Sequence, residues 1–515
     1  MTTHPILPAG VTAAAFGHAI SEFRAIVGAE HVIGEPERLA PYRKVYIAVA
    51  EDALAPSAAL MPKTVPEIQK ILAVCNRYKV PVWTISTGRN IGMGSAAPAM
   101  RGEVILDLKR MNRIIEVDAE LGTALVEPGV TYLDLKNYLD EHKLPFWVDA
   151  PSPGPIASPI GNTLERGHGY TTNQDHVYAF SGMEVVLANG DILRTGMGPL
   201  PNCKSWQAFR SGYGPYIDGM FTQSNFGIVT KMGIWLTPVQ EGAKSFVIYY
   251  DRRDDLVAAV DTFRQLRLAG TISVSGSILD GLTLLGFGQS KRNFYSGTGA
   301  IPRAEIDALL KEKGLPQWRV GGVVYGDNEE TAIKLRKIRR AFEATRPREV
   351  LIEDSSGVVP SWGEGDLASA TGQLSLDAFR ILNFVGGGGV MWHMPVSAMK
   401  GRYVQELCTL SEDVLRRFGF DYLSMNWCND RDMHQTTGIF FDHSDPVQMQ
   451  VAHDCYDALM QETSAAGFGN YRCSVHYMDK AAELFGPELR GFLRSIKRAV
   501  DPAGILAPGK SGIHI

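Results

Sequence analysis

The sequence predicts an α+β protein of two lobes, with mixed sheets and helices, and three observations support this. The chain of 515 residues is too long for one hydrophobic core, so two or three domains are expected. Helical and strand-like patterns alternate through residues 1–242, change character through 243–467 and return to glycine-punctuated loops from 468 to 515. With 45% hydrophobic and 21% charged residues, the composition is that of an ordinary soluble globular protein.

The clearest elements follow in chain order. Residues 64–78 (TVPEIQKILAVCNRY) predict a helix, because Thr64 can cap it, Pro66 and Glu67 suit its first turn, and apolar residues recur at helical spacing. The strand PVWTIS follows directly. Further short, β-branched runs predict strands in GEVILDL, TALVEPG, MEVVLANG, GIVTKMGIWL and SFVIYY. Helices are predicted in DDLVAAVDTFRQLRL and VQELCTLSEDVLRRFG.

Composition and charge argue against several classes of function. The net charge is −5 with mixed signs and no basic stripe, so no nucleic-acid partner is expected. No apolar window reaches about 18 residues, so no membrane span is expected. The start of the chain shows no signal peptide, which favours a cytoplasmic location. The six cysteines are scattered without a CxxC pair, so neither a disulfide framework nor a metal site is predicted.

The stretch PVWTISTGRNIGMGSA, residues 81–96, places three glycines in a turn directly after a strand. Consecutive backbone N–H groups in such a turn form a concavity that suits phosphate, and hydroxyl groups and an arginine add donors and charge. A tight turn without a ligand is the alternative. The turn is not the dinucleotide fingerprint, because no helix opens directly behind it. The candidate phosphate-binding residues are Ser86, Thr87, Gly88, Arg89, Asn90, Ile91, Gly92 and Ser95.

Two further glycine segments have the same character. Residues 150–170 (APSPGPIASPIGNTLERGHGY) combine prolines that fix the backbone with small residues, and FTQSNFGIVTKMG leads from a glycine into a strand. One large ligand with a pyrophosphate and a ring system would explain all three segments together. The candidate residues here are Pro159, Gly161, Asn162, Arg166, Gly167, Gly227, Ile228 and Val229.

Several long motifs resemble the vanillyl-alcohol oxidase / p-cresol methylhydroxylase family of FAD enzymes: STGRNIGMGSAAP, GNTLERGHGYT, MEVVLANGDILRTGMG, DGMFTQSNFGIVTKMG and ILAPGKSGI. The resemblance implies a two-lobed FAD-binding domain formed by residues 1–242 and 468–515, with an α+β cap domain at 243–467. It implies FAD as the cofactor, with its diphosphate at the Ser86–Ser95 loop. Lys510 matches a basic residue near the flavin ring, where it could stabilise negative charge on reduced flavin.

The resemblance also implies a reaction. Family members remove hydride from the benzylic carbon of para-substituted phenols such as 4-alkylphenols, 4-hydroxybenzyl alcohols and lignin-type phenylpropanoids, via a quinone methide, giving hydroxylated, alcohol or aldehyde products. Tyr471 and Arg472 match the family's phenolate-binding pair, and both favour an ionised phenol. His434 matches an active-site histidine and is the best acid/base candidate. A structural arginine beside a buried tyrosine, and a histidine satisfied in the core, are the alternatives.

The chain departs from the family at several positions. A second phenol-binding tyrosine reads Met93, two cap-domain glutamates read Ala378 and Met425, and an active-site aspartate reads Pro153. The family therefore supplies no water-activating base here. The predicted substrate pocket consists of Met93, Met425, Leu382 and His393.

The segment LNFVGGGGVMWHMP bears on how the flavin is held. The histidine and tyrosine that link the flavin covalently in the family read Val390 and Leu382, and neither has a nucleophile. His393 lies three residues beyond Val390, which in a strand points to the other face. The FAD is therefore predicted to be non-covalent. The four glycines at 386–389 suggest close backbone approach to a flat ligand.

Two hypotheses of function follow. The first is an oxidoreductase that passes electrons to O2 or to a small cytochrome c subunit, in which case a periplasmic location is the alternative. The second is a catalytically impaired flavin-binding partner subunit. A homodimer is expected from the family.

Overall fold

The computed structural model describes residues 6–152, 154–274, 276–353 and 363–515. By its internal contacts the chain forms two compact units. The first contains Met1–Gly169, Asp175–Thr237 and Ser474–Ile515, and the second contains Tyr170–Gln174 and Pro238–Cys473. These divisions fall a few residues from the predicted domain boundaries, and the short segment 170–174 joins the second unit, which sequence reasoning did not anticipate. Pro153 lies outside the described residues.

The first unit contains a four-stranded sheet in the order β1 (Val32–Ile33), β2 (Ala58–Leu60), β4 (Val104–Asp107), β3 (Val82–Ile85), in which β4 runs parallel to both neighbours. Helix α3 (Val65–Tyr78) packs on α1 (Ala13–Val27). Thr64 caps α3 by accepting a hydrogen bond from the Glu67 backbone N–H at 3.3 Å, as predicted. The helix at 64–78 and the strand after it are therefore confirmed.

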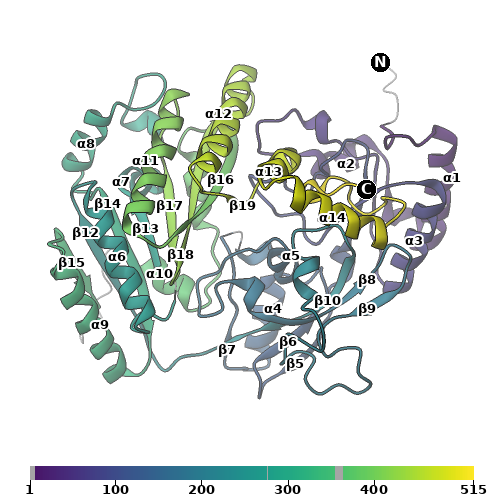
Figure 1. The fold of residues 1–515 in the computed structure, drawn as a ribbon, viewed down its shortest axis with the longest axis horizontal. Coiled ribbons are helices and arrows are strands. Elements are labelled where there is room, and N and C mark those ends of the chain that lie inside the picture. The colour runs from purple at the N-terminus through teal and green to yellow at the C-terminus, as the bar shows by residue number, and fades with distance from the viewer. Residues whose placement is uncertain (1–5, 153, 275, 354–362) are drawn as a thin grey trace. The chain divides into compact units, whose positions relative to one another are not determined.

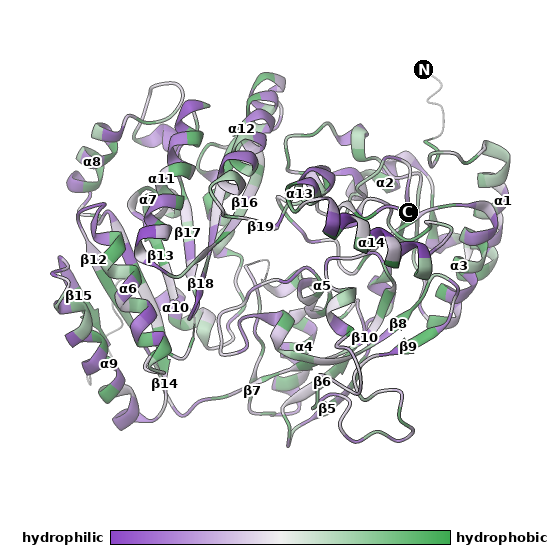
Figure 2. Cartoon of the chain, viewed as in Figure 1, coloured by the Kyte–Doolittle hydropathy of each residue, from purple (hydrophilic) through white to green (hydrophobic). Residues whose placement is uncertain are grey.

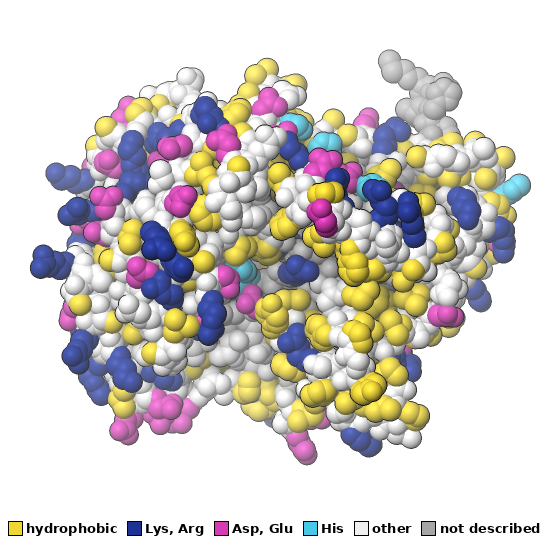
Figure 3. All heavy atoms as spheres, viewed as in Figure 1, with side chains coloured by type: hydrophobic (Ala, Val, Ile, Leu, Met, Phe, Trp, Pro, Cys, Tyr) yellow, Lys and Arg dark blue, Asp and Glu magenta, His cyan; other side chains and the backbone are white. Residues whose placement is uncertain are grey.

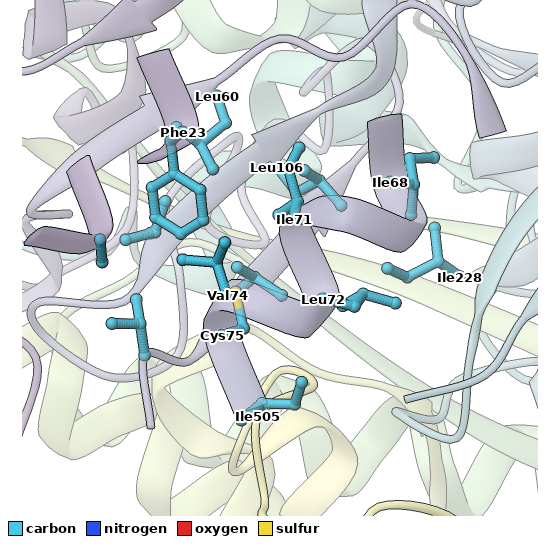
Figure 4. Packing of buried hydrophobic residues seen from close by; sticks show 14 of the residues in the cluster. Phe23, Leu60, Ile68, Ile71, Leu72, Val74, Cys75, Leu106, Ile228 and Ile505 are labelled. Atoms are coloured by element: carbon cyan, nitrogen blue, oxygen red, sulfur yellow. The ribbon is translucent and has the colours of Figure 1, made fainter. Parts of the chain in front are cut away.

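The core of the first unit joins segments that are far apart in the sequence. Phe23 of α1 and Ile71 of α3 pack with Leu106 of β4, and Ile228 and Ile505 complete the cluster (Figure 4). Backbone hydrogen bonds tie the C-terminal segment to β3, from Val82 N–H to the Ile505 carbonyl at 2.8 Å and from Ala507 N–H to the Val82 carbonyl at 2.8 Å. The end of the chain thus returns to the first unit.

A second sheet of the first unit is antiparallel throughout. Its order is β5 (Ile114–Asp118), β6 (Thr123–Val126), β10 (Ile228–Trp235), β8 (Phe180–Val186), β9 (Ile192–Arg194). The strands predicted in GEVILDL, TALVEPG, MEVVLANG and GIVTKMGIWL are β4, β6, β8 and β10. Other elements of the chain are α2 (Pro36–Arg43), α4 (Tyr132–Glu141), α5 (Pro159–Leu164), α13 (Met478–Leu484), α14 (Pro487–Val500), β7 (Phe146–Trp147) and β11 (Thr237–Pro238).

The second unit is built on one eight-stranded antiparallel sheet. The order is β15 (Glu349–Ile352), β12 (Ala243–Tyr250), β14 (Trp318–Tyr325), β13 (Gly276–Asp280), β17 (Ser424–Cys428), β18 (Asp432–Asp442), β16 (Gly388–Ala398), β19 (Asn470–Arg472). Its helices include α6 (Asp255–Leu268), α7 (Gly281–Gly288), α8 (Arg303–Glu312), α9 (Asn328–Glu343), α10 (Gly363–Ala370), α11 (Gly401–Arg417) and α12 (Pro446–Ala465).

Helices α6, α9, α11 and α12 lie along this sheet (Figure 1). Hydrophilic and hydrophobic residues are interspersed along α11 and α12, as expected for helices with one face on a sheet (Figure 2). The strand predicted in SFVIYY is β12, and the two predicted helices are α6 and α11. The α+β class is therefore confirmed in both units. Basic and acidic side chains are interspersed over the visible surface, in keeping with the net charge of −5 (Figure 3).

Candidate functional site

The loop after β3 contains a dense run of left-handed backbone conformations. The φ angles are +66° at Gly88, +75° at Gly92, +115° at Gly94 and +53° at Ser95. The carbonyl of Asn90 accepts hydrogen bonds from the Met93 N–H at 3.1 Å and the Ser95 N–H at 2.9 Å, which closes the turn. Glycine is needed at three of these positions because a side chain strains positive φ angles.

The donors of this loop fit a diphosphate. Within the described part of the chain, the backbone N–H groups of Gly88, Arg89, Ile91, Gly92 and Gly94 donate to no acceptor, although Gly92 and Gly94 are buried. The buried Ser95 hydroxyl likewise has no partner among the described residues. Buried N–H groups seldom stay unpaired in proteins, so an acceptor such as phosphate is expected there. The residues present therefore fit the phosphate groups of FAD.

The glycines of this loop also serve its own packing. A Cβ on Gly88 would lie 2.9 Å from the Cβ of Ala96, and a Cβ on Gly94 would lie 2.3 Å from Val475 Cγ2. Sequence reasoning offered a tight turn and ligand approach as the reasons for these glycines. The structure adds a third reason, which is contact with side chains of the same unit.

The second glycine segment meets the first directly. Residues 159–164, which the sequence suggested as a loop, form the short helix α5, capped by Ser158. A Cβ on Gly161 would lie 2.1 Å from Ser86 Oγ, so this glycine lets α5 approach the end of β3. A Cβ on Gly167 would lie 2.0 Å from Asn162 Oδ1. Arg166 donates to Thr222 Oγ1 at 3.4 Å. The structure therefore brings two of the three predicted segments together.

The third segment begins β10 in the middle of a sheet. Ile228 and Val229 pair with Val186 and Val185 of β8. On the other side, β6 pairs only with residues from Met232 onward, so no strand of the described residues covers that edge of Ile228 and Val229. Because the Ile228 side chain is buried in the core, only backbone groups can be offered to a ligand at this edge. The predicted contact of these backbone groups with a flat ring system stays a prediction. A Cβ on Gly227 would lie 2.4 Å from Val185 Cγ1, so packing also requires that glycine.

Lys510 has partners that the sequence did not reveal. Its ammonium group forms an ion pair with Glu165, at the end of α5, and lies 5.3 Å from the ring centroid of Trp83 on β3. The Lys510 side chain is 13% exposed. The pairing places a positive charge beside the α5 and β3 segments, while its predicted role toward reduced flavin stays a prediction.

In the second unit, the three predicted catalytic residues lie on β18 and β19, the two strands that flank β16. His434 of β18 pairs with Val396 of β16, and Arg472 of β19 pairs with Met394 of the same strand. The rings of His434 and Tyr471 are tilted by 30° with centroids 4.6 Å apart. His434 Nε2 lies 2.9 Å from Asp432 Oδ1, so the histidine has a carboxylate partner and is not an apolar core residue.

The strand beside His434 presents two large side chains on the same face. Along β17, Met425 and Trp427 are half-buried, whereas Ser424, Asn426 and Cys428 between and beside them are buried. Trp427 pairs with His434 across the strands, so both lie on one face. The predicted pocket residue Met425 shares this face, since it lies two residues from Trp427.

Two aromatic residues of this face were missed by sequence reasoning. Tyr170 contacts Trp427 edge-on, with ring centroids 5.3 Å apart and planes at 64°. Tyr170 lies in the short segment 170–174 that joins the second unit. Its position directly after the RGHG motif was the only sequence signal that could have singled it out.

The prediction that His393 lines the pocket with Met425 is wrong. His393 is fully buried, lies 3.2 Å from Thr463 Oγ1 of α12 and pairs with Thr437 on β18. Thr437 is three residues from His434, so His393 and His434 occupy opposite faces of the sheet. Burial lowers the pKa of His393 to about 3, which keeps the ring neutral. Side chains alternate between the two faces along a strand, which separates His393 from Val390 and also keeps His393 off the face of His434.

The other two residues predicted to line the pocket are Met93 and Leu382. Met93 belongs to the first unit, where its side chain is buried. Leu382 lies in a 3-10 turn, Asp377–Asn383, and is half-buried. Among the glycines at 386–389, Gly389 packs closely against β18. A Cβ on Gly389 would lie 2.5 Å from the Phe441 ring. Packing therefore accounts for that glycine without a ligand.

Within the described ranges, no group of three or more His, Cys, Asp or Glu side chains is arranged to hold a metal ion. No helix among the same residues is long and apolar enough to cross a membrane.

Comparisons with known proteins define the class first. Residues 56–196 match the family described as FAD binding domain, and residues 375–511 match FAD linked oxidases, C-terminal domain. Together with the loop after β3, these matches define an FAD-linked oxidoreductase.

Full-length relatives then define the family. The 4-cresol dehydrogenase [hydroxylating] flavoprotein subunit of Pseudomonas putida is 40% identical over 512 residues, covering 99% of this chain and 98% of that protein. The crystal structure of p-cresol methylhydroxylase with substrate bound matches with a TM-score of 0.96 at 39% identity, covering 99% of both chains. The isoeugenol complex of 4-ethylphenol oxidase from Gulosibacter chungangensis matches with a TM-score of 0.94 at 31% identity, again covering 99% of both. The chain belongs to the p-cresol methylhydroxylase family of flavoproteins, which confirms the resemblance.

Proposed function

We propose that this protein is an FAD-dependent oxidoreductase that removes hydride from the benzylic carbon of para-substituted phenols, above all 4-alkylphenols. The observation that carries the proposal is the grouping of Tyr471, Arg472 and His434 on β18 and β19, the two strands that flank β16 in the second unit. The relatives named above act, by their names, on 4-cresol and 4-ethylphenol, and hydroxylated, alcohol or aldehyde products are expected.

The residues of the second unit suit a phenolate. The Arg472 guanidinium and the Tyr471 hydroxyl can both donate to the phenol oxygen, and both interactions favour its ionised form. An ionised phenol releases hydride from its para carbon more readily, because the product is a neutral quinone methide. His434 serves as the acid/base group. Met425 and Trp427 give the same sheet face apolar surface that suits an alkyl or aryl substituent.

The residues of the first unit would hold FAD, which when bound supplies the hydride acceptor. The loop after β3 would bind the diphosphate, the α5 segment and the open edge of β10 would contact the ring system, and Lys510 would balance negative charge. The cofactor is held without a covalent bond, because Val390 and Leu382 have no nucleophile. The proposed FAD-binding residues are Ser86, Thr87, Gly88, Arg89, Asn90, Ile91, Gly92, Ser95, Pro159, Gly161, Asn162, Arg166, Gly167, Gly227, Ile228, Val229 and Lys510.

Anaerobic mixing tests the reaction. The flavin-loaded protein is mixed with 4-ethylphenol, 4-cresol or vanillyl alcohol, and the flavin absorbance is followed. Loss of the oxidised flavin bands is the expected result. No reduction across the panel would contradict the proposal and favour the catalytically impaired flavin-binding subunit, an alternative motivated by the missing acidic residues at Pro153, Ala378 and Met425.

The proposal also covers the electron acceptor, the oligomeric state and the cellular location of the protein. A small cytochrome c subunit is the proposed acceptor, by analogy with the relative named as a flavoprotein subunit, and O2 is the alternative. Reoxidation of the reduced protein by air or by added ferricytochrome c distinguishes the two. A homodimer is proposed, which sedimentation would test. The proposed location is the cytoplasm, or the periplasm if a cytochrome accepts the electrons, and cell fractionation decides between them.

A further inference from the structure

Tyr471 and Arg472 are consecutive residues of β19, and consecutive side chains of a regular strand point to opposite faces of the sheet. Binding of one phenol oxygen by both residues requires that they lie on the same face. Tyr471 lies on the face of His434, since their ring centroids are 4.6 Å apart. Arg472 can share this face only if β19 departs from regular strand geometry.

Strand pairing assigns Arg472 to the face of His434. Val396 of β16 pairs with His434, so these two side chains lie on one face. Met394 lies two residues before Val396 on the same strand and therefore shares that face. Arg472 pairs with Met394 across β16 and β19. Tyr471 and Arg472 therefore both project from the face of His434.

A β-bulge in β19 makes this arrangement possible. Met394 pairs with Arg472, and the next residue of β16, Pro395, pairs with Asn470. One step along β16 thus corresponds to two steps along β19, and Tyr471 is the extra residue. A bulge bends the strand and redirects its side chains, and bulges are frequent next to active sites. The bulge therefore allows two consecutive residues to face the same side.

The side chain of Asn470 supports the bulge from the opposite face. Asn470 Oδ1 accepts a hydrogen bond from the Met394 N–H at 3.0 Å, and Asn470 Nδ2 lies 3.4 Å from Nε2 of the buried His393. The neighbouring Val396 N–H donates to the Gly469 carbonyl at 2.9 Å, just before β19. A side-chain acceptor thus takes the strand N–H beside the bulge. His393, which does not line the predicted pocket, contacts this same side chain.

We infer that Asn470 is a positioning residue. Its hydrogen bond with the Met394 N–H holds the β19 bulge, and the bulge directs Tyr471 and Arg472 toward one phenol oxygen. The inference rests on the proposed function. Asn470 lies on the face away from His434 and acts on the reaction only through the geometry of the bulge. A misplacement of about 1 Å can cost on the order of 100-fold in rate, so loss of this support should affect binding and turnover of phenols.

The test measures binding of 4-chlorophenol to the flavin-loaded protein by titration of the flavin absorbance. This probe has no benzylic carbon and cannot be oxidised. Asn470→Ala should weaken its binding and lower kcat/KM for 4-cresol, each by about tenfold. Asn470→Leu has a similar shape without an acceptor and should show the same loss. Asn470→Asp keeps an acceptor for the Met394 N–H and should recover most of the affinity.

Gln448→Ala is the matched control. Gln448 Oε1 accepts a hydrogen bond from the Asp442 N–H at 3.1 Å, at the other end of β18 from His434. Gln448 and Asn470 are both half-buried side chains that accept from a strand N–H of the same sheet. Gln448→Ala should lower the stability in urea about as much as Asn470→Ala, but its affinity for 4-chlorophenol should match that of the wild type.

A double-mutant cycle separates positioning from a general loss of structure. In the Arg472→Ala protein, Asn470→Ala should weaken 4-chlorophenol binding by less than about threefold, because a group that it positions is gone. Wild-type affinity in Asn470→Ala, or a further loss of about tenfold in the Arg472→Ala background, would overturn the inference and leave the proposed function intact. If 4-cresol fails to reduce the wild-type flavin, the proposed function itself fails, and the inference falls with it.

Discussion

Glu103, at the start of β4, should make the stability of the first unit depend on pH. Its side chain is 1% exposed, and both carboxyl oxygens lack a hydrogen-bond partner among the described residues. Burial raises the pKa of Glu103 to about 8, and the nearby Met100 backbone and, less strongly, the positive charge of Lys497 partly oppose this rise. The folded protein therefore keeps this carboxyl protonated at neutral pH.

The magnitude follows from the two pKa values. The ordinary pKa of the group is 4.5, so between pH 4.5 and about 8 the unfolded chain has released a proton that the folded chain retains. The stabilisation from Glu103 is complete below pH 4.5 and is lost as the pH rises toward 8. The slope is about 1.36 kcal/mol per pH unit, so the free energy of unfolding should fall by about 2.7 kcal/mol between pH 5 and pH 7.

Urea unfolding at pH 5 and pH 7, with the same excess of FAD, measures this difference. Glu103→Gln cannot ionise, so its loss of stability between the two pH values should be smaller than that of the wild type by about 2.7 kcal/mol. Glu116→Gln is the control, because Glu116 is an exposed residue of the same unit. Equal pH dependence in the wild type and Glu103→Gln would refute the reasoning.

Four other outcomes are expected. Arg472→Ala should weaken binding of 4-chlorophenol by roughly 10- to 100-fold, since a charge-assisted hydrogen bond contributes about 1.5–3 kcal/mol, and unchanged affinity in a titration would remove Arg472 from the site. Gly92→Val should give folded protein with little flavin. Gly270→Val is the control, because Gly270 has a similar φ of +68° and an added Cβ there meets no atom within 4 Å, so this variant should keep its flavin. Equal flavin content in the two variants would show that the phosphate-binding loop lies elsewhere. Lys497→Met should lower the free energy of unfolding in urea by about 3–5 kcal/mol. It removes the charge partner of the buried Asp501 carboxylate, which lies 2.7 Å from the Lys497 ammonium group. A loss below about 1 kcal/mol, which is typical of an exposed ion pair, would contradict this. Acid precipitation should leave FAD in the supernatant and a colourless pellet, whereas a yellow pellet would show a covalent link.

Local sequence determined the elements and the glycine turn after β3. The helix α3 could be predicted because its cap, its first-turn proline and its apolar spacing all lie within residues 64–78. The loop after β3 could be predicted because positive φ angles require glycine wherever the chain folds, and hydroxyl residues stood beside the glycines. Tyr471, Arg472 and His434 were found through family motifs that are contiguous in the sequence.

Tertiary structure alone decided which of these residues meet. The contact of His434 with Tyr471, the ion pair of Lys510 with Glu165 and the packing of Tyr170 on Trp427 all join segments that are distant in the chain. His393 was assigned to the pocket by its nearness in sequence, but strand alternation and pairing placed it under α12. The physical reason is that turn and helix signals act over a few residues, whereas side-chain neighbours across a sheet depend on strand order and register, which no local pattern encodes.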